Sequence, residues 1–391
     1  MTRIPLCVPH LAGNEAAYLK ECVDTNWVSS AGPFVDRFER DMAARLGLSH
    51  AVATVNGTAA LHLALLVAGV RPGDIVPMSN LTFIAPANAV RYLGASPLFV
   101  DADPATWQMD AGLLVRYLED DCEPCSHGLR ERATGQRIGA LLPVHILGHP
   151  VDMDPILDVA RRFAIPVIED ATESLGAAYK KRPVGTLADA ACLSFNGNKL
   201  MTSGGGGMVV TGRADWAERI RHLATQAKSD ALEFVHDEIG YNYRLTNLQA
   251  ALGVAQLERL DDLIATKRRI ALRYRQAFAD LPGLHFMPQA SWAESVFWLS
   301  TVRIDAKAFG MDRKAVGVAL AARGIETRPL WQPMHRSPAH AGARTLGGAV
   351  AERLQGESLS LPSSCGMTEE HQERVVKALV GLSPFHVREN G

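Results

Sequence analysis

Asp170 and Lys199 are the two residues of this sequence whose types and positions best support joint chemistry. Val167 and Ile168 predict a short apolar strand with Asp170 at its carboxyl end, where open α/β sheets present their ligand-binding groups. A second strand is predicted over residues 191–195. Lys199 lies on the polar turn after it, before four glycines that let the backbone approach closely. We therefore expect the two side chains to share one cleft.

A lysine beside a strand-end aspartate is the arrangement that pyridoxal phosphate chemistry needs. The amine forms a Schiff base with the cofactor, and the carboxylate keeps the pyridine nitrogen protonated, so that the ring withdraws electrons. Judged on these two residues alone, an exposed lysine and an aspartate that caps a helix are about equally consistent with the sequence. Other motifs must therefore decide between the two interpretations.

A tight turn between the strand predicted at 50–55 and the helix predicted at 59–68 is suited to holding a phosphate group. Gly57 would admit an oxyanion close to the backbone, Thr58 offers a hydroxyl, and the helix start presents unpaired N–H groups with a favourable dipole. Taken alone, Asn-Gly-Thr before a helix more often marks only a turn with a helix cap. Farther on, the ring of Phe83 could lie flat against a pyridine ring or could pack in the core.

Strand and helix patterns alternate along the first part of the chain, which predicts an α/β fold with a mostly parallel sheet flanked by helices. Residues 119–134 interrupt this alternation and predict a charged surface loop. A long amphipathic helical stretch over 248–278 then leads to shorter elements, which predict a smaller α/β domain. We expect a large domain over residues 1–255, followed by a connecting helix and a small domain over 256–391.

The composition describes a soluble globular chain of 391 residues, of which 47% are hydrophobic and 21% charged. The net charge of −2 gives no bulk basic character for nucleic acid or an anionic membrane, and no apolar run is long enough to span a bilayer. The start lacks a secretory signal pattern and the six cysteines lack disulfide spacing, so we expect a cytoplasmic protein. Cys122 and Cys125 form one CxxC near His127, but a structural zinc site needs four ligands, so we expect no metal.

The sequence resembles the DegT/DnrJ/EryC1/StrS family of pyridoxal phosphate-dependent nucleotide-sugar aminotransferases over nearly its whole length. The resemblance rests on ordered motifs: Pro9 to Gly32, Asn56-Gly-Thr-Ala-Ala-Leu61, Thr82-Phe-Ile-Ala85, Pro143-Val-His145, Glu169-Asp-Ala-Thr-Glu-Ser-Leu-Gly176, Ser194-Phe-Asn-Gly-Asn-Lys199, the glycines at 204–207, and Tyr241 to Gly253. It implies the aspartate aminotransferase-like fold, called fold type I, with a large cofactor-binding domain and a smaller C-terminal α/β domain.

The resemblance also implies roles for the candidate cofactor contacts. Lys199 would carry pyridoxal 5′-phosphate in a Schiff-base linkage and move a proton during transamination, while Asp170 would keep the ring nitrogen charged. Ser194 and Thr58 would bind the phosphate group. Asn242 would join them from a neighbouring subunit, which implies a homodimer whose active sites are shared across the interface.

Glu173 lies one helical turn beyond the strand-end aspartate and could bond the 3-oxygen of the cofactor or atoms near it. A carboxylate that faces a phenolate would need a shared proton, so its role stays open. Four residues are weaker candidates for substrate contacts: Trp27, His145, Trp331 and His335. Trp27 could instead anchor the core, His145 could be a buried, hydrogen-bonded histidine, and the loop over 328–335 could simply be exposed.

Within the family, the motifs most resemble enzymes that make 4-amino-4,6-dideoxy sugars from nucleotide-linked 4-keto sugars, near the bacillosamine and legionaminic acid pathway enzymes. This ranks UDP-linked 2-acetamido-4-keto-6-deoxyglucose first and a GDP-linked 4-keto sugar of the perosamine type second. L-Glutamate is the expected amino donor, in the biosynthesis of cell-surface glycans. Some relatives carry histidine in place of Lys199 and remove a sugar hydroxyl, so the lysine favours transamination. A cofactor-free Schiff-base lyase and a non-enzymatic scaffold are the remaining alternatives.

Overall fold

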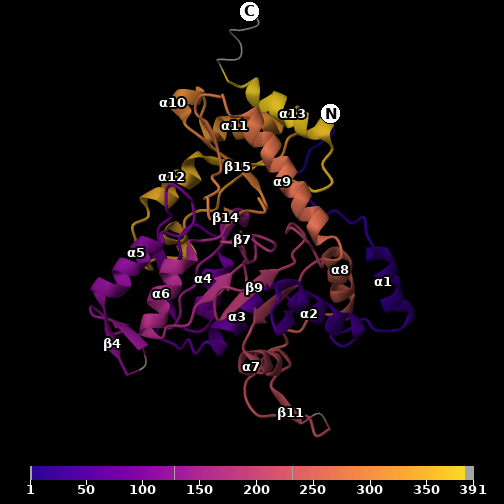
Figure 1. Cartoon of the computed structure of the whole chain (residues 1–391), viewed down its shortest axis with the longest axis vertical. Coiled ribbons are helices and arrows are strands. Elements are labelled where there is room, and N and C mark those ends of the chain that lie inside the picture. The colour runs from indigo at the N-terminus through magenta and orange to yellow at the C-terminus, as the bar shows by residue number, and fades with distance from the viewer. Residues whose placement is uncertain (1, 127, 231, 384–391) are drawn as a thin grey trace, which may run out of the picture.

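The computed structural model describes residues 2–126, 128–230 and 232–383 (Figure 1). Four strands lie side by side at one end of a large sheet, in the order β1 (His50–Thr54), β10 (Gly207–Thr211), β9 (Ala190–Ser194) and β6 (Ile168–Asp170). Residues 138–144 extend it beside β6, and next to them lie β2 (Ile75–Ser79), β3 (Ser96–Val100) and β17 (Arg344–Leu346). These pairings are parallel except for those of β10, which runs antiparallel to both neighbours. The predicted mostly parallel sheet is therefore confirmed.

Helices cover both faces of this sheet. This follows from the alternation of strands and amphipathic helices along the chain, since each helix packs its apolar face against the sheet. One face packs against α3 (Gly57–Val67), α4 (Ala85–Tyr92) and α7 (Ala214–Ala224). The opposite face packs against α2 (Pro33–Leu46), α5 (Ala111–Arg116), α6 (Met153–Phe163) and α8 (Asn247–Leu257). Most residues of α3 are buried, so its first turn is fixed relative to the strands.

The stretch predicted as one helix over 248–278 is two helices, α8 and α9 (Leu260–Ala277). Between them, the Glu258 carboxylate accepts hydrogen bonds from Asn14, Tyr18 and Arg37, each at 2.7 Å. These contacts hold the end of α8 against the N-terminal segment, and the chain turns before α9 runs to the C-terminal part (Figure 1). Amphipathic periodicity did not reveal the break, because both halves have an apolar face.

The C-terminal part contains an antiparallel sheet in the order β13 (Leu284–Phe286), β15 (Ser300–Ile304), β18 (Ser358–Leu361) and β16 (Arg328–Pro329). Its core includes side chains of α9, α11 (Arg313–Ala322) and α13 (Glu369–Val380). Ile4 is buried in the same core and pairs with Ile325, whereas β17 joins the large sheet. Segments from both ends therefore cross the domain boundary expected at 255/256. No helix among the described residues is both long and apolar enough to cross a bilayer.

Within residues 119–134, which the sequence predicts as a charged surface loop, the described residues include two paired strands. β4 (Cys122–Cys125) pairs with β5 (Gly128–Glu131), and burial of Cys122 and Leu129 ties the hairpin to the core. His127 lies outside the described residues. The remaining elements are α1 (Glu15–Asp24), a π-helical turn (Tyr117–Asp121), β7 (Ala178–Tyr179), β8 (Arg182–Pro183), β11 (Lys228–Asp230), β12 (Val235–His236), β14 (Ala293–Glu294), α10 (Ala306–Phe309), α12 (Ala349–Glu357) and the 3₁₀ turns Ile146–Gly148, Met334–Arg336 and Pro338–His340.

Candidate active site

A cavity of about 270 Å³ lies where β6 and β9 end and α3 begins. It brings together residues that the sequence singled out: Gly57, Thr58, Phe83, Asp170, Glu173, Ser194, Lys199 and Trp331. The cleft expected to hold both the strand-end aspartate and the lysine is therefore present. Because these residues come from separate strands, helices and turns, the sheet itself determines their relative positions.

The first turn of α3 forms one wall of the cavity. The Asn56 side chain accepts a hydrogen bond from the backbone N–H of Ala59 at 2.8 Å and so caps the helix. A Cβ on Gly57 would lie 2.9 Å from the Cβ of Ser194, so the helix start and the end of β9 are in close contact. Together with the Thr58 hydroxyl, these groups surround a helix N-terminus, where an anion is favoured.

Asp170 is a carboxylate that is only 2% exposed, and no cation lies within 4 Å of it in the part of the chain that the structure describes. Its carboxylate accepts one backbone hydrogen bond, from Thr172 N–H at 3.1 Å. Burial raises the pKa of Asp170, although the charge of Lys199 acts in the opposite direction. A protonated ring nitrogen in the cavity would supply the missing cationic partner. The donor set therefore fits the pyridine ring of pyridoxal phosphate.

The Lys199 ammonium lies between a carboxylate and an aromatic ring. Its Nζ is 3.5 Å from Glu173 Oε1 and 4.3 Å from the centroid of the Trp298 ring. The other oxygen of Glu173 accepts a hydrogen bond from Leu147 N–H at 2.9 Å. Burial raises the pKa of Glu173, while the charge of Lys199 lowers it. The amine is thus held by two neighbours, with 14% of its side chain exposed.

Trp298 is a cavity residue that sequence reasoning missed. Its indole N–H donates to the Asn198 carbonyl at 2.7 Å, directly before Lys199 in the chain, and its ring stacks on Trp331 with centroids 6.4 Å apart. The apolar pattern over residues 297–304 predicts a strand that would include this tryptophan, but β15 begins only at Ser300. Residues before a strand follow no periodicity, so no pattern indicated that its side chain enters the cavity.

Two strained residues support this arrangement. Leu147 and Phe297 have positive φ angles of 59° and 50°, which non-glycine residues rarely adopt. The backbone N–H of Leu147 donates to the Glu173 carboxylate, and the Leu147 carbonyl accepts a hydrogen bond from the backbone N–H of Trp298 at 3.0 Å. One residue therefore positions both groups that flank the Lys199 ammonium. Backbone strain of this kind concentrates at functional sites.

His145 does not line the cavity. It is fully buried, and Val151 N–H donates to its Nδ1 at 3.0 Å, which leaves the proton on Nε2. That nitrogen faces Glu169 Oε2 at 3.1 Å, and the Glu169 carboxylate also accepts backbone N–H groups of the turn at 185–188. These contacts match the second interpretation, a buried, hydrogen-bonded histidine beside the end of β6.

Three other candidates lie outside the cavity of this chain. Trp27 is 48% exposed, so it is not a core anchor. The His335 ring is hydrogen-bonded to Asn80 and Glu352. Asn80 lies two residues before Thr82, which lines the cavity together with Phe83. Asn242 is exposed. Substrate contacts by Trp27 and His335, and a cofactor contact by Asn242 in a neighbouring subunit, therefore stay predictions.

The chain matches the DegT/DnrJ/EryC1/StrS aminotransferase family over residues 9–380. It is 42% identical to a GDP-perosamine synthase of Caulobacter vibrioides, an alignment that covers 97% of this chain and 98% of that one. It is 39% identical to EpsN of Bacillus subtilis, a putative pyridoxal phosphate-dependent aminotransferase, over 99% and 97% of the two chains. The crystal structure of DesV from S. venezuelae superposes with a TM-score of 0.86 at 31% identity, covering 97% and 98%. The chain therefore belongs to the DegT/DnrJ/EryC1/StrS aminotransferase family and is a pyridoxal phosphate-dependent aminotransferase.

Proposed function

We propose that the protein transfers the amino group of L-glutamate to C4 of a GDP-linked 4-keto-6-deoxy sugar. The observation that carries the aminotransferase chemistry is the cavity in which Lys199 and Asp170 lie beside the start of α3. The choice of sugar is supported by the similarity to a GDP-perosamine synthase along nearly the whole of both chains. The sequence motifs alone ranked a UDP-linked sugar first and the GDP-linked sugar second. The similarity reverses that order in our proposal.

The residues of the cavity have distinct tasks in this reaction. When bound, pyridoxal phosphate supplies a ring that stabilises negative charge on carbon. Asp170 keeps a proton on the ring nitrogen, because a buried carboxylate needs a cationic partner. The Lys199 amine holds the cofactor and, once free, moves a proton at Nζ. Glu173 and Trp298 keep that nitrogen in one position, 3.5 Å from the carboxylate and 4.3 Å from the ring centroid.

The phosphate group would be bound by Gly57, Thr58 and Ser194 at the start of α3. We infer that Asn242 completes this binding site in a second copy of the chain. In its own subunit Asn242 is exposed and is not part of the cavity wall, so it is available to a neighbour. An amide donor would hold the phosphate without adding a cation near Lys199.

The experiment is a substrate comparison with purified, cofactor-loaded protein. GDP- and UDP-linked 4-keto-6-deoxy sugars are supplied with L-glutamate, and both the amino sugar and 2-oxoglutarate are measured. We expect amino sugar from the GDP-linked substrate at a higher kcat/KM. A preference for the UDP-linked sugar would restore the first ranking. Loss of a sugar hydroxyl without amination would indicate a dehydratase.

A visible absorbance spectrum separates the remaining alternatives. The linkage between Lys199 and pyridoxal phosphate absorbs in the visible, whereas a cofactor-free lyase or a scaffold would be colourless. The Lys199→Ala variant should lose both this absorbance and the cofactor that borohydride fixes to the wild-type chain. If borohydride still fixed the cofactor to this variant in full, another lysine would hold it.

A further inference from the structure

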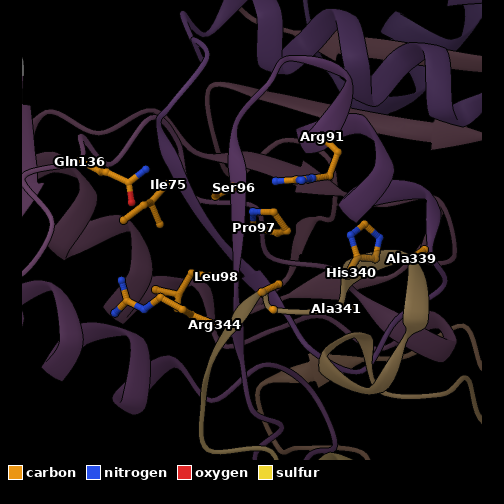
Figure 2. A pocket seen from close by; sticks show the side chains of 12 residues that line it. Ile75, Arg91, Ser96, Pro97, Leu98, Gln136, Ala339, His340, Ala341 and Arg344 are labelled. Atoms are coloured by element: carbon orange, nitrogen blue, oxygen red, sulfur yellow. The ribbon is translucent and has the colours of Figure 1, made fainter.

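Lys267 is a buried lysine that has no place in the proposed reaction as described so far. It lies in the middle of α9 and is 1% exposed. Figure 2 shows the more usual setting of a cation: Arg91 and Arg344 line a second cavity, at the starts of β2 and β3, and both stay exposed. Burial of an ammonium group is costly unless its neighbours replace water. The neighbours of Lys267 therefore indicate what this burial achieves.

Three groups replace water around the Lys267 ammonium. Its Nζ donates to the backbone carbonyl of Trp298 at 2.7 Å and to that of Ser363 at 2.5 Å, and it lies 3.4 Å from Cys7 Sγ. The backbone N–H of Ser363 in turn donates at 2.7 Å to the carbonyl of Leu6, directly before Cys7. All three donors of the ammonium thus have uncharged acceptors, which come from three separate segments of the chain.

Two of these segments also hold the carbonyl that precedes Lys199. The indole N–H of Trp298 donates to the Asn198 carbonyl at 2.7 Å, and the Cys7 thiol donates to the same oxygen at 3.3 Å. Lys267 is therefore one contact away from each of these two donors, which fix the backbone directly before the active-site lysine.

We infer that Lys267 is a positioning residue for the Lys199 amine, an inference that rests on the proposed role of Lys199 in holding the cofactor. Lys267 is not part of the cavity wall, so it acts through Trp298 and Cys7. By binding the Trp298 carbonyl, it keeps the indole 2.7 Å from the Asn198 carbonyl and 4.3 Å from the Lys199 ammonium. Other side chains of α9 pack in the core of the C-terminal part, which thereby helps to fix the amine.

The test compares Lys267→Met with Tyr274→Phe as a matched control. Tyr274 is fully buried on the same helix, and its hydroxyl donates to the Pro362 carbonyl at 3.0 Å. Tyr274→Phe therefore removes a buried hydrogen bond from the same region and leaves the contacts of Lys267 in place. Pyridoxal phosphate is added to each cofactor-free protein, and the increase in visible absorbance gives the rate at which the linkage to Lys199 forms. Thermal unfolding gives the stability of each variant.

We expect the linkage to form about tenfold more slowly in Lys267→Met and at the wild-type rate in Tyr274→Phe, even where both variants unfold at a lower temperature. Trp298→Phe lacks the indole N–H, so adding Lys267→Met to it should slow the step by less than tenfold. Equal rates in Lys267→Met and Tyr274→Phe would overturn the inference. An undiminished tenfold effect in the Trp298→Phe background would overturn it as well, because Lys267 would not act through Trp298.

Borohydride fixation distinguishes this inference from the role of Lys199. It should fix the cofactor in full to Lys267→Met, in which Lys199 is still present, and not to Lys199→Ala. The opposite result would make Lys267 the lysine that holds the cofactor, and both assignments would fail. Full fixation to Lys199→Ala and to Lys267→Met alike would remove the role of Lys199 on which the inference rests.

If Lys267→Met yields no folded protein, the two contacts through which Lys267 acts are tested directly. Cys7 is only half-buried, so Cys7→Ala should fold, and Trp298→Phe keeps an aromatic ring in place. Slower formation of the linkage in either variant, at wild-type thermal stability, would support the inference. Wild-type rates in both variants would overturn it.

Discussion

Lys199 combines two contacts that favour a fixed position for its amine. The face of Trp298 attracts the ammonium, and the indole N–H of the same residue holds the carbonyl of Asn198 at 2.7 Å. One side chain therefore positions both the backbone and the tip of the lysine. The Glu173 carboxylate on the other side is in turn oriented by Leu147, whose strained backbone also binds Trp298.

Two replacements of Trp298 separate these contacts. Trp298→Phe keeps an aromatic face but loses the N–H donor, and Trp298→Leu loses both. Since a cation–π contact contributes roughly 0.5–2 kcal/mol, we expect kcat to fall about tenfold in Trp298→Leu and less in Trp298→Phe. The rate at which cofactor-free protein takes up pyridoxal phosphate should follow the same order. If both rates in Trp298→Leu equalled those of the wild type, at equal thermal stability, a positioning role would be excluded.

The buried carboxylate of Asp170 predicts a stability cost in the cofactor-free protein. Because burial raises its pKa, the native state keeps a proton on Asp170 at pH values where the unfolded chain has lost it. Stability therefore falls as pH rises from the ordinary pKa of an aspartate to the raised native value, and the cost is fully present above that value. Asp170→Asn removes this cost and can still accept the Thr172 hydrogen bond.

We thus expect cofactor-free Asp170→Asn to unfold at a higher temperature than the wild type. The difference should grow as pH rises from the ordinary pKa of an aspartate to the raised native value, and stay constant above it. Thermal unfolding in buffers across that range measures it, with Asp215→Asn as a control at an exposed aspartate. A difference that shrank as pH rose would show that Asp170 is stabilised as an ion. Transamination should be lost in Asp170→Asn in either case.

At the scale of elements, local sequence patterns predicted what depends on local periodicity. They identified the strand ends that carry Asp170 and Ser194 and the mostly parallel character of the sheet, and they placed the start of α3 two residues late, at residue 59 instead of Gly57. They missed features that depend on distant contacts. The break at Glu258 depends on bonds to the N-terminal segment, and β17 joins the large sheet from far along the chain.

The same distinction applies to the candidate site. Motif residues at the carboxyl ends of strands share one edge of the sheet, and the sequence placed them in one cavity correctly. His145 also follows a strand of this sheet, but its ring lies beneath that edge against Glu169. Trp298 belongs to an aperiodic segment shaped by Leu147 and Phe297, and strained backbone leaves no pattern in sequence.

The close contact between α3 and β9 predicts the effect of adding one methyl group. In Gly57→Ala the new Cβ would lie 2.9 Å from Ser194 Cβ and 3.4 Å from Thr172 Cγ2. Overpacking of this kind costs about 1–3 kcal/mol of unfolding free energy and would displace Ser194, which we propose binds the cofactor phosphate. In the control Gly212→Ala, where no atom lies within 4 Å of the new Cβ, we expect a change within about 0.5 kcal/mol. Urea unfolding and the Kd for pyridoxal phosphate measure both effects. Equal unfolding free energies and equal Kd values for Gly57→Ala and Gly212→Ala would contradict a close contact between Gly57 and Ser194.

At the scale of the whole molecule, the hairpin of β11 and β12 projects from the large domain below α7 (Figure 1). Large apolar side chains are exposed between and just after these strands: Leu232 is 87% exposed, Phe234 68% and Ile239 85%. Exposed apolar side chains grouped in this way mark a contact surface. Asn242 follows directly in sequence, so a partner that covers the hairpin would also meet the Asn242 loop. This supports our proposal that two copies of the chain share their active sites.

Complementation between two inactive variants tests the shared site. Asn242→Asp would repel the cofactor phosphate, and Lys199→Ala lacks the amine, so each homodimer should be inactive. The two variants are mixed under conditions that exchange subunits. If Asn242 acts in the neighbouring subunit, a mixed dimer has one site with both defects and one site with neither.

Activity should then reappear well above that of either variant alone. With random exchange, half of the dimers are mixed and each has one intact site, so the mixture should recover about a quarter of the wild-type activity per chain. If Asn242 instead served its own subunit, every site in a mixed dimer would keep one defect. Absence of recovery, with subunit exchange confirmed by differently tagged chains, would therefore exclude a site shared through Asn242.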